Sequence, residues 1–246
     1  TFENVSFKYL GTDTFQSKNL NITINKGERL AVIGLNGAGK STFIKLLSRI
    51  YDPLEGEVRI EDAGLMRPLN TVHADEWHTN ISCLFQDYAR YHFTVKNYIS
   101  FNAPYDEERL KKAIEMATAE FVYELPNKLD QQLGVDLDGV DLSKGQWQKI
   151  ALARTLYREC RVLILDEPTA TIDAISARRI YENLRNLPED KTLIFISHNM
   201  VDIPFVATRI MLIEHGEIVG IGTHKQLLAK SKAYRELYES ARETDK

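Results

Sequence analysis

The sequence of 246 residues contains no apolar run that approaches the roughly 20 residues needed for a membrane-spanning helix. It has only two cysteines, Cys83 and Cys160, and no Cys/His spacing typical of zinc sites, so we expect both thiols to be reduced and buried in the core. The formal net charge of −4 provides no basic footprint of the kind that nucleic-acid binding requires. We therefore expect neither a disulfide framework nor a nucleic-acid partner.

The chain also lacks an initiator methionine and the basic-then-apolar start of a signal peptide. Because residues 2–9 already alternate apolar and polar side chains like a strand, we expect the chain to be a C-terminal piece of a longer protein. A content of 43% hydrophobic residues is enough for a sizeable core. Short apolar runs between polar helical stretches predict an α/β fold, which we expect to form a single domain over residues 1–246.

The hydrophobic pattern places most of the secondary structure. Residues 2–9 and 19–24 predict an antiparallel pair, and residues 209–213 and 217–221 predict a hairpin. Further strands are expected at residues 29–34, 56–61, 80–85, 161–165 and 192–197. Helices are expected at residues 40–50, 94–125, 144–157 and 173–187, with amphipathic helices in the tail. The order of strand, Gly-rich turn and helix over residues 29–50 is the most informative, because that order is the setting of a phosphate-binding loop.

The Gly-rich turn fits the pattern G-x-x-x-x-G-K-[ST] over eight residues: Gly34, Leu35, Asn36, Gly37, Ala38, Gly39, Lys40 and Ser41. Its glycines let backbone N–H groups close around phosphates, and the helix that follows directs the positive end of its dipole at them. We expect Lys40 to bridge the β- and γ-phosphates and the Ser41 hydroxyl to bind Mg²⁺. The sequence therefore predicts an ATP site.

Two carboxylates, Asp166 and Glu167, follow the apolar strand at residues 161–165. Alone, such a pair is more often a solvated strand end, but next to a phosphate loop it has the chemistry of phosphoryl transfer. We expect Asp166 to contact Mg²⁺ and Glu167 to orient the attacking water. His198, directly after the strand at residues 192–197, is expected to donate a hydrogen bond to the γ-phosphate.

Residues 142–146, Leu-Ser-Lys-Gly-Gln, look like the LSGGQ signature of ABC ATPases and lie 20 residues before Asp166 at the start of a helix. The resemblance extends over essentially the whole chain. Tyr9 resembles the aromatic residue that stacks on adenine, Gln86 the glutamine of the Q-loop, residues 170–173 the D-loop, and His198 the switch histidine. The sequences of residues 88–95 and 222–228 are similar to those of exporters of the peptide or lantibiotic type.

The resemblance implies a P-loop NTPase (RecA-like) core with an antiparallel β subdomain and an inserted α-helical subdomain. Residues 1–86 and 159–246 would form the core with the β subdomain, and residues 87–158 the helical subdomain. The implied residues around the chain's own ATP are Tyr9, Gly34, Leu35, Asn36, Gly37, Ala38, Gly39, Lys40, Ser41, Thr42 and Gln86. Catalysis would depend on Glu167, His198 and Lys40, and Mg²⁺ binding on Ser41, Gln86 and Asp166.

The family also implies a head-to-tail dimer in which each signature serves the partner's ATP. In this chain Ser143, Lys144, Gly145, Gln146 and Asp173 would then face the partner's nucleotide. A homodimer is favoured, because Glu167 and His198 are both present, and a heteromeric partner stays open. Lys144 departs from the usual glycine, and its cation would either assist phosphate binding or obstruct it. Thr171 is a second departure, because a small residue is common at that position.

The leading hypothesis is an ATPase that drives export through a membrane-spanning domain on the same polypeptide, at the cytoplasmic face of the cell membrane. The alternatives are a soluble ABC ATPase acting on DNA or ribosomes, and a non-hydrolysing nucleotide-dependent clamp. The spacing of 126 positions between Lys40 and Asp166, without a heptad run, argues against the coiled-coil insertion of DNA-repair relatives. Five aromatic residues would either line a groove for the membrane domain or form the core of the helical part: Tyr88, Tyr91, Phe93, Tyr98 and Phe101.

Overall fold

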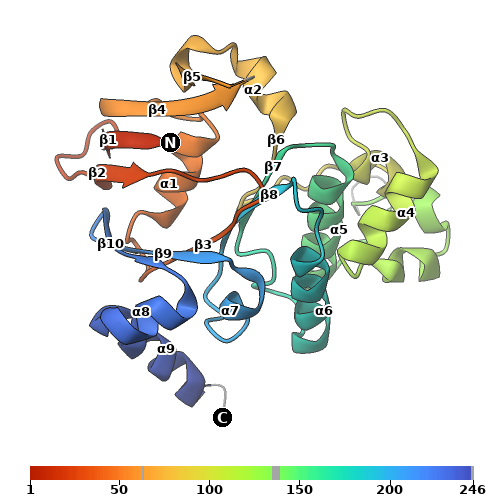
Figure 1. Ribbon diagram of the computed structural model, residues 1–246. Helices are drawn as coiled ribbons and strands as arrows, with labels where there is room; N and C mark the ends of the chain where they lie inside the picture. Colours follow the sequence, from red (N-terminus) through yellow and green to blue (C-terminus); the bar gives the residue numbers. More distant parts are fainter. Residues whose placement is uncertain (63, 135–138, 245–246) are drawn as a thin grey trace.

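The computed structural model describes residues 1–62, 64–134 and 139–244, which form two β-sheets with helices packed around them (Figure 1). The strands are β1 (Phe2–Phe7), β2 (Ser17–Ile22), β3 (Arg29–Ile33), β4 (Glu55–Asp62), β5 (Leu65–Pro68), β6 (Ile81–Leu84), β7 (Val162–Asp166), β8 (Thr192–Ile196), β9 (Arg209–Glu214) and β10 (Glu217–Gly222). The helices are α1 (Lys40–Leu47), α2 (Ala74–Asn80), α3 (Val95–Ile99), α4 (Glu107–Met116), α5 (Lys144–Tyr157), α6 (Ala174–Arg185), α7 (Ile203–Val206), α8 (His224–Lys230) and α9 (Lys232–Thr244).

The smaller sheet has the strand order β2-β1-β4-β5, and all of its neighbouring strands are antiparallel. The larger sheet has the order β10-β9-β3-β8-β7-β6, in which β10 pairs antiparallel with β9 and every other pair is parallel. The predicted antiparallel start and the predicted hairpin near the C-terminal end are therefore confirmed. In the parallel part, β3, β8, β7 and β6 lie next to one another, so the loops that follow them meet at one edge.

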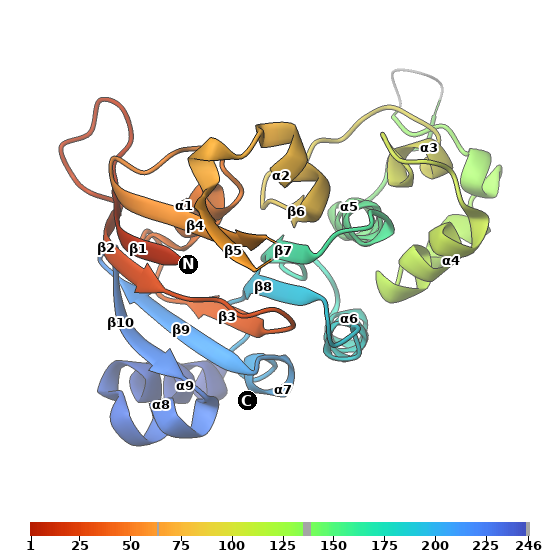
Figure 2. The same ribbon diagram turned by 45° about the horizontal axis from the view of Figure 1, so that its top comes forward.

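The parallel strands at the centre of the larger sheet, β3, β7 and β8, read as continuous apolar runs because both faces of the sheet are buried there. In β3, Leu30 and Val32 belong to one hydrophobic cluster, whereas Ala31 and Ile33 belong to the other. This alternation is the two-residue period of a strand. The first cluster contains α1 and the inner side of the smaller sheet, and the second contains α5, α6 and the helices α3 and α4. Figure 2 shows α3 and α4 beside α5, away from the smaller sheet.

Several elements differ from the sequence-based expectation. The first helix ends at Leu47 instead of residue 50, and Arg49 adopts a left-handed φ of 54°. The stretch 94–125 is divided into α3, α4 and a short 3-10 turn instead of being mainly one helical run. The pattern did not predict β5, α2 or α7, because segments of 4 to 7 residues are too short to show a clear period.

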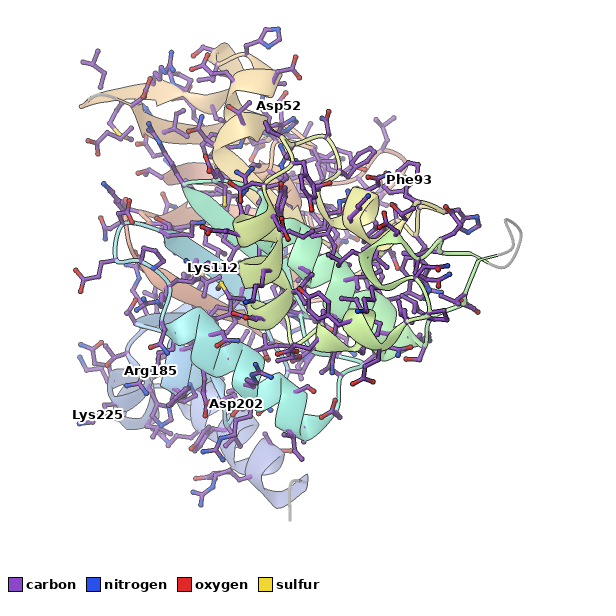
Figure 3. All side chains as sticks on the ribbon, turned by 90° about the vertical axis from the view of Figure 1, so that its right-hand side faces the viewer. Asp52, Phe93, Lys112, Arg185, Asp202 and Lys225 are labelled. Carbon is purple, nitrogen blue, oxygen red and sulfur yellow. The ribbon has the colours of Figure 1, made fainter. Side chains whose placement is uncertain are left out.

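The structure corrects the expectation for the cysteines and decides between the two alternatives for the aromatic residues of the helical part. Cys83 and Cys160 are free thiols, as expected, but they are only partly buried at the margins of the core. Of the aromatic residues, Tyr98 is fully buried and packs edge-on against Trp147, whereas Tyr91, Phe93 and Phe101 are each 37% or 38% exposed. Phe93 is labelled in Figure 3, where it lies on the helical part, far from Lys225 of α8. Of the five aromatic residues, Tyr98 is therefore core, Tyr88 is partly buried against the core, and three form a surface group.

Within the described ranges, no helix has the length and apolar character needed to cross a membrane. This agrees with the hydropathy of the sequence.

Candidate nucleotide-binding site

The Gly-rich loop joins β3 to α1, and its backbone fits only glycine at two positions. Gly39 has a φ of 109°, and a Cβ on it would lie 2.5 Å from the carbonyl oxygen of Gln16. Gly34 has a φ of 149°, and its Cβ would lie 2.2 Å from the carbonyl oxygen of Ile213. Gly39 is also the N-cap of α1, where no side chain accepts a hydrogen bond from the first turn. The N–H groups of that turn are thus left for an anion.

Lys40, the first residue of α1, lies beneath this loop and is only 7% exposed. Its Nζ donates to the carbonyl oxygens of Gly34 at 2.9 Å and Leu35 at 3.0 Å. Burial lowers the pKa of the Lys40 ammonium, and the nearby carboxylates of Glu167 and Asp166 oppose that shift. The ammonium is therefore held at the loop by backbone carbonyls, which are weaker partners than phosphate oxygens would be.

Asp166 ends β7 and is 4% exposed, so its carboxylate is one of the few buried charges of the chain. Burial raises the pKa of Asp166, and a hydrogen bond with the Ser41 hydroxyl acts in the opposite direction. One hydroxyl and one carboxylate side by side are hard oxygen donors that fit Mg²⁺, which keeps most of its other positions for water and phosphate oxygens. In keeping with this small donor set, no group of three or more His, Cys, Asp or Glu residues forms a metal cage in the described ranges.

Glu167 and His198 meet above the ends of β7 and β8. The distance from His198 Nε2 to Glu167 Oε1 is 2.6 Å, and the Glu167 side chain is 17% exposed. Glu167 has a left-handed φ of 52°, which is unusual for a residue with a side chain. Its N–H donates to the carbonyl oxygen of Ile196 at 3.1 Å, which ties this bend to β8. Strained backbone of this kind is most frequent at functional positions.

The remaining residues expected around the nucleotide lie at the borders of this site. The Tyr9 hydroxyl is 3.1 Å from the Thr42 hydroxyl, which brings Tyr9 beside the first turn of α1. The Tyr9 ring packs edge-on against Phe7 and Tyr51. Gln86 is exposed two residues after the end of β6, the strand that pairs with β7. Asn36 and Gly37 are exposed in the loop, whereas Ala38 is buried.

The residues of the signature segment start α5. Ser143 is the N-cap, with its Oγ accepting from the Gln146 N–H at 3.2 Å, and Gln146 Oε1 accepts from the Ser143 N–H at 3.0 Å. Lys144 is exposed, and its carbonyl oxygen accepts from the Tyr88 hydroxyl at 3.3 Å. A Cβ on Gly145 would lie 2.8 Å from the carbonyl oxygen of Thr171. The contacts of this segment thus run to the loops on either side of it.

Asp173 caps α6 in this chain: its Oδ1 accepts from the Ser176 N–H at 2.9 Å. The hydrogen bonds from Ser176, together with the nearby Lys149, lower the pKa of Asp173 to about 2. Lys149 Nζ lies 3.4 Å from Asp173 Oδ2. The side chain that we expected at the partner's nucleotide is thus held by its own helix.

Gln148 is a polar residue that the sequence did not single out. It is 5% exposed on α5, and its Nε2 donates to the carbonyl oxygen of Glu167 at 2.7 Å. Its Oε1 accepts from both the N–H and the hydroxyl of Thr171, at 2.8 and 2.6 Å. The sequence did contain a signal for this residue, because Gln148 lies between Trp147 and Ile150 on the buried side of a helix. A buried polar group needs hydrogen-bond partners, so a role in joining two segments could have been predicted.

Two cavities border these elements. One of about 270 Å³ lies between the Gly-rich loop, the residues after β8 and helix α9, and it is lined by Asn36, His198 and Leu237, among others. A larger one of about 790 Å³ lies at the opposite edge of the sheet, between the two sheets, lined by residues such as Arg59, Glu61 and Arg161. Ligands of open parallel sheets bind at the carboxyl ends of the strands, so the smaller cavity borders the expected site.

The Gly-rich loop with its buried lysine and the acidic end of a parallel neighbouring strand define a P-loop nucleotide-binding protein. Comparison with known proteins agrees. The family model described as "ABC transporter" matches residues 17–170, more than half of the chain, so the chain belongs to the ABC transporter family, as an ATP-binding domain.

Several relatives are similar over nearly the whole chain. The subtilin transport ATP-binding protein SpaT of Bacillus subtilis is 38% identical over 244 residues, which are 97% of this chain and 39% of that protein. The nisin transport ATP-binding protein NisT of Lactococcus lactis is 35% identical, over 98% of this chain and 40% of that protein. An ATP-dependent lipid A-core flippase of Pasteurella multocida is 36% identical, over 97% of this chain and 40% of that protein.

A solved structure of a bacterial Atm1-family ABC exporter with ATP bound superposes with a TM-score of 0.88 at 29% identity, over 98% of this chain and 41% of that one. The mixed α/β architecture predicted from the sequence is therefore confirmed. The chain spans about two fifths of the length of the relatives it matches. These relatives are named as transport ATP-binding proteins, a flippase and an exporter, which gives no support to a soluble DNA- or ribosome-directed ATPase or to a clamp.

Proposed function

We propose that this chain hydrolyses ATP and thereby powers export by a membrane-spanning domain. The observation that carries the proposal is the pair Glu167–His198, 2.6 Å apart at the strand ends beside Asp166 and Lys40. Phosphoryl transfer needs mainly positioning and electrostatic stabilisation, and these four side chains supply a base, a donor, a metal ligand and a cation.

In the proposed reaction the Gly-rich loop and Lys40 bind the β- and γ-phosphates, and Tyr9 packs against the adenine ring. Ser41, Asp166 and Gln86 would hold Mg²⁺, which when bound would neutralise phosphate charge. The Glu167 carboxylate accepts a hydrogen bond from a water and orients its oxygen towards the γ-phosphorus. The new bond forms between these two atoms while the bond from the γ-phosphorus to the bridging oxygen breaks, and Glu167 accepts the water's proton.

His198 acts at the γ-phosphate in this proposal. In the chain without substrate its Nε2 is directed at Glu167, and a bound phosphate would supply an alternative acceptor for its N–H. Lys40 would likewise exchange the carbonyl oxygens of Gly34 and Leu35 for phosphate oxygens, which bind an ammonium more strongly. In both exchanges a side chain changes its hydrogen-bond acceptor without a rearrangement of the backbone.

The second half of the proposal is a head-to-tail dimer with a second ABC ATPase domain, most simply another copy of this chain. Helix α5 has 14 residues, and its N-terminus carries an exposed cation, Lys144. Such a terminus attracts phosphate. Since the chain's own Gly-rich loop is already served by α1, we assign the start of α5, with Ser143, Gly145 and Gln146, to the partner's ATP. Asp173 would approach the same interface.

We further propose that residues 87–158 form the helical subdomain, and residues 1–86 and 159–246 the core with the β subdomain. The rings of Tyr91, Phe93 and Phe101 stack on one another, and Arg154 lies over those of Tyr91 and Phe101. This exposed aromatic group would contact the membrane-spanning domain. An aromatic group of this kind suits a protein interface better than a free surface. This assignment puts the domain at the cytoplasmic face of the cell membrane, with the membrane-spanning domain on the same polypeptide and no nucleic acid as partner.

The test is Mg-ATP turnover of the purified chain as a function of protein concentration, with Glu167→Gln as the inactive variant and exposed Glu61→Gln as its matched control. We expect turnover to rise more steeply than linearly with concentration, and light scattering to detect an ATP-dependent dimer in Glu167→Gln. The Gln variant should lose roughly 100- to 1,000-fold in turnover while still binding ATP. Tight ATP binding without turnover or dimer in any variant would contradict the proposal.

A further inference from the structure

Gln148 occupies a buried position from which it reaches two functional loops at once. It lies on the second turn of α5, five residues after the N-cap Ser143. Its Nε2 donates to the carbonyl oxygen of Glu167 at 2.7 Å, and its Oε1 accepts from the N–H of Thr171 at 2.8 Å and from the Thr171 hydroxyl at 2.6 Å. All three contacts fall within the range of good hydrogen bonds, so this side chain is fixed at both ends.

The contact with Glu167 acts on a strained residue. The left-handed φ of 52° directs the Glu167 side chain away from the course of β7, and only the surrounding contacts hold such a conformation in place. The Glu167 N–H donates to the carbonyl oxygen of Ile196, and the Glu167 carbonyl oxygen accepts from Gln148 at 2.7 Å and, at the longer distance of 3.3 Å, from the Ala170 N–H. With Gln148 removed, the shorter of the two hydrogen bonds to this carbonyl oxygen is lost. The carboxylate would then be held less firmly in the position from which it faces His198.

The contact with Thr171 fixes the loop that leads from Glu167 to α6. The Thr171 hydroxyl adds a second hydrogen bond to Gln148 that a small apolar residue at this position would lack. On its other side, the carbonyl oxygen of Thr171 lies against Gly145, where a Cβ would be 2.8 Å away. Next along α5, Lys149 Nζ donates to Ser176 Oγ at 2.7 Å and lies near Asp173. The start of α5 is therefore hydrogen-bonded to this loop through Gln148, lies close against it at Gly145, and is joined through Lys149 to the first turn of α6.

We infer that Gln148 is a positioning residue for ATP hydrolysis: together with Thr171 it fastens the Glu167 backbone to the first turns of α5. The carboxylate that orients the attacking water and the segment that we assign to the partner's ATP then move as one unit. Docking of a phosphate at the start of α5 would thereby be transmitted to Glu167 through hydrogen bonds of a single side chain. This inference rests on the proposed function, because it assigns a role within the same reaction.

The test uses substitutions that remove these hydrogen bonds with little change in volume. Gln148→Met removes the donor and the acceptor, and Thr171→Val removes only the hydroxyl, since the Thr171 N–H remains. Thr171→Ser retains the hydroxyl and serves as the rescue variant. Gln131→Met is the matched control, because Gln131 is also 5% exposed, with hydrogen bonds of its own in the helical part.

We expect Gln148→Met to lower kcat of ATP hydrolysis by about 10-fold or more, with the ATP dissociation constant changed by less than about threefold. Thr171→Val should lower kcat by roughly three- to tenfold, while Thr171→Ser stays within about twofold of the parent. The double variant Gln148→Met/Thr171→Val should be no slower than Gln148→Met alone, because both act through one link. Gln131→Met should reduce thermal stability to a similar degree and leave kcat within about twofold.

Equal kcat values for the parent and Gln148→Met would overturn the inference, and so would a loss in Gln131→Met as large as that in Gln148→Met. If Thr171→Ser were as slow as Thr171→Val, the hydroxyl would have no part in the link. A parent chain without any turnover would overturn the proposed function instead. In that case hydrogen exchange of residues 167–173 still decides the link: faster exchange in Gln148→Met than in Gln131→Met supports it, and equal exchange rules it out.

Discussion

The Gly-rich loop with its neighbouring strand ends and the start of α5 are the two arrangements that we propose for phosphate binding, and their surroundings differ. Lys40 is 7% exposed and donates to Gly34 and Leu35. Asp166 is 4% exposed and is hydrogen-bonded to Ser41. Lys144, in contrast, is exposed, and the first turn of α5 carries only its own capping box. Charge placed in a buried environment acts strongly because the local dielectric is low, whereas an exposed cation is screened by salt.

The difference supports the proposal that the chain contains one complete half-site and one that serves a ligand bound to a partner. The buried half has its charges paired or hydrogen-bonded before any nucleotide arrives, which is the preorganisation that catalysis requires. In the part of the chain that the structure describes, the exposed half is a helix start held by its own capping box. Perturbing the two halves should therefore have effects of very different size.

The largest effect is expected for Lys40→Met in the buried half. This change removes a desolvated ammonium, so the ATP dissociation constant should rise by about 100-fold, the value of two charge-assisted hydrogen bonds. The burial that lowers the pKa of Lys40 also makes its ammonium costly to hold, and this cost offsets the lost hydrogen bonds to Gly34 and Leu35, so the melting temperature should change little. Equilibrium titration with ATP and thermal unfolding measure the two quantities. Exposed Lys112→Met on α4 is the control, and a similar loss of affinity there would erase the contrast between the halves.

A smaller effect is expected for Lys144→Gly in the exposed half. The substitution restores the glycine of the signature and removes a screened cation, so the ATP concentration at half-maximal turnover should rise by about two- to fivefold. Lys144→Arg retains the charge and should behave like the parent. The gap between the Gly and Arg variants should narrow at high salt. Faster turnover of Lys144→Gly at all ATP concentrations would mean that the lysine side chain obstructs the site.

The smallest effect is expected for Asp173→Asn, which acts at the border between the halves. The folded-state pKa of Asp173 is lowered from 3.8 to about 2, so the carboxylate stabilises the folded chain above pH 4 or so. That contribution should decline as the pH falls from there towards the folded-state pKa. Urea unfolding of the parent and the variant should therefore show a small difference at pH 7 that shrinks at pH 3. A difference that widens in acid would contradict the assignment.

Much of the site follows from local sequence. The strand at residues 29–33, its Gly-rich turn and the helix that follows are encoded by adjacent residues, because left-handed turns need glycine and a helix start needs free N–H groups. The same holds for α5, which begins and ends at the residues expected from its capping serine and its period. Ser143 and Gln146 lie three residues apart, which is enough to predict a capping box.

Tertiary structure decided which of these loops and helix starts lie next to one another. No local pattern fixes the strand order β3-β8-β7-β6, which sets Lys40, His198, Glu167 and Gln86 along one edge, although 158 positions separate Lys40 from His198 in the sequence. That order depends on packing both faces of the sheet and on the crossover connections between parallel strands. Gln148 was missed for the same reason: whether a buried glutamine binds a distant backbone is decided by which loops pack against its helix. The sequence by itself determined the chemistry of each loop, and the fold determined which loops share a ligand.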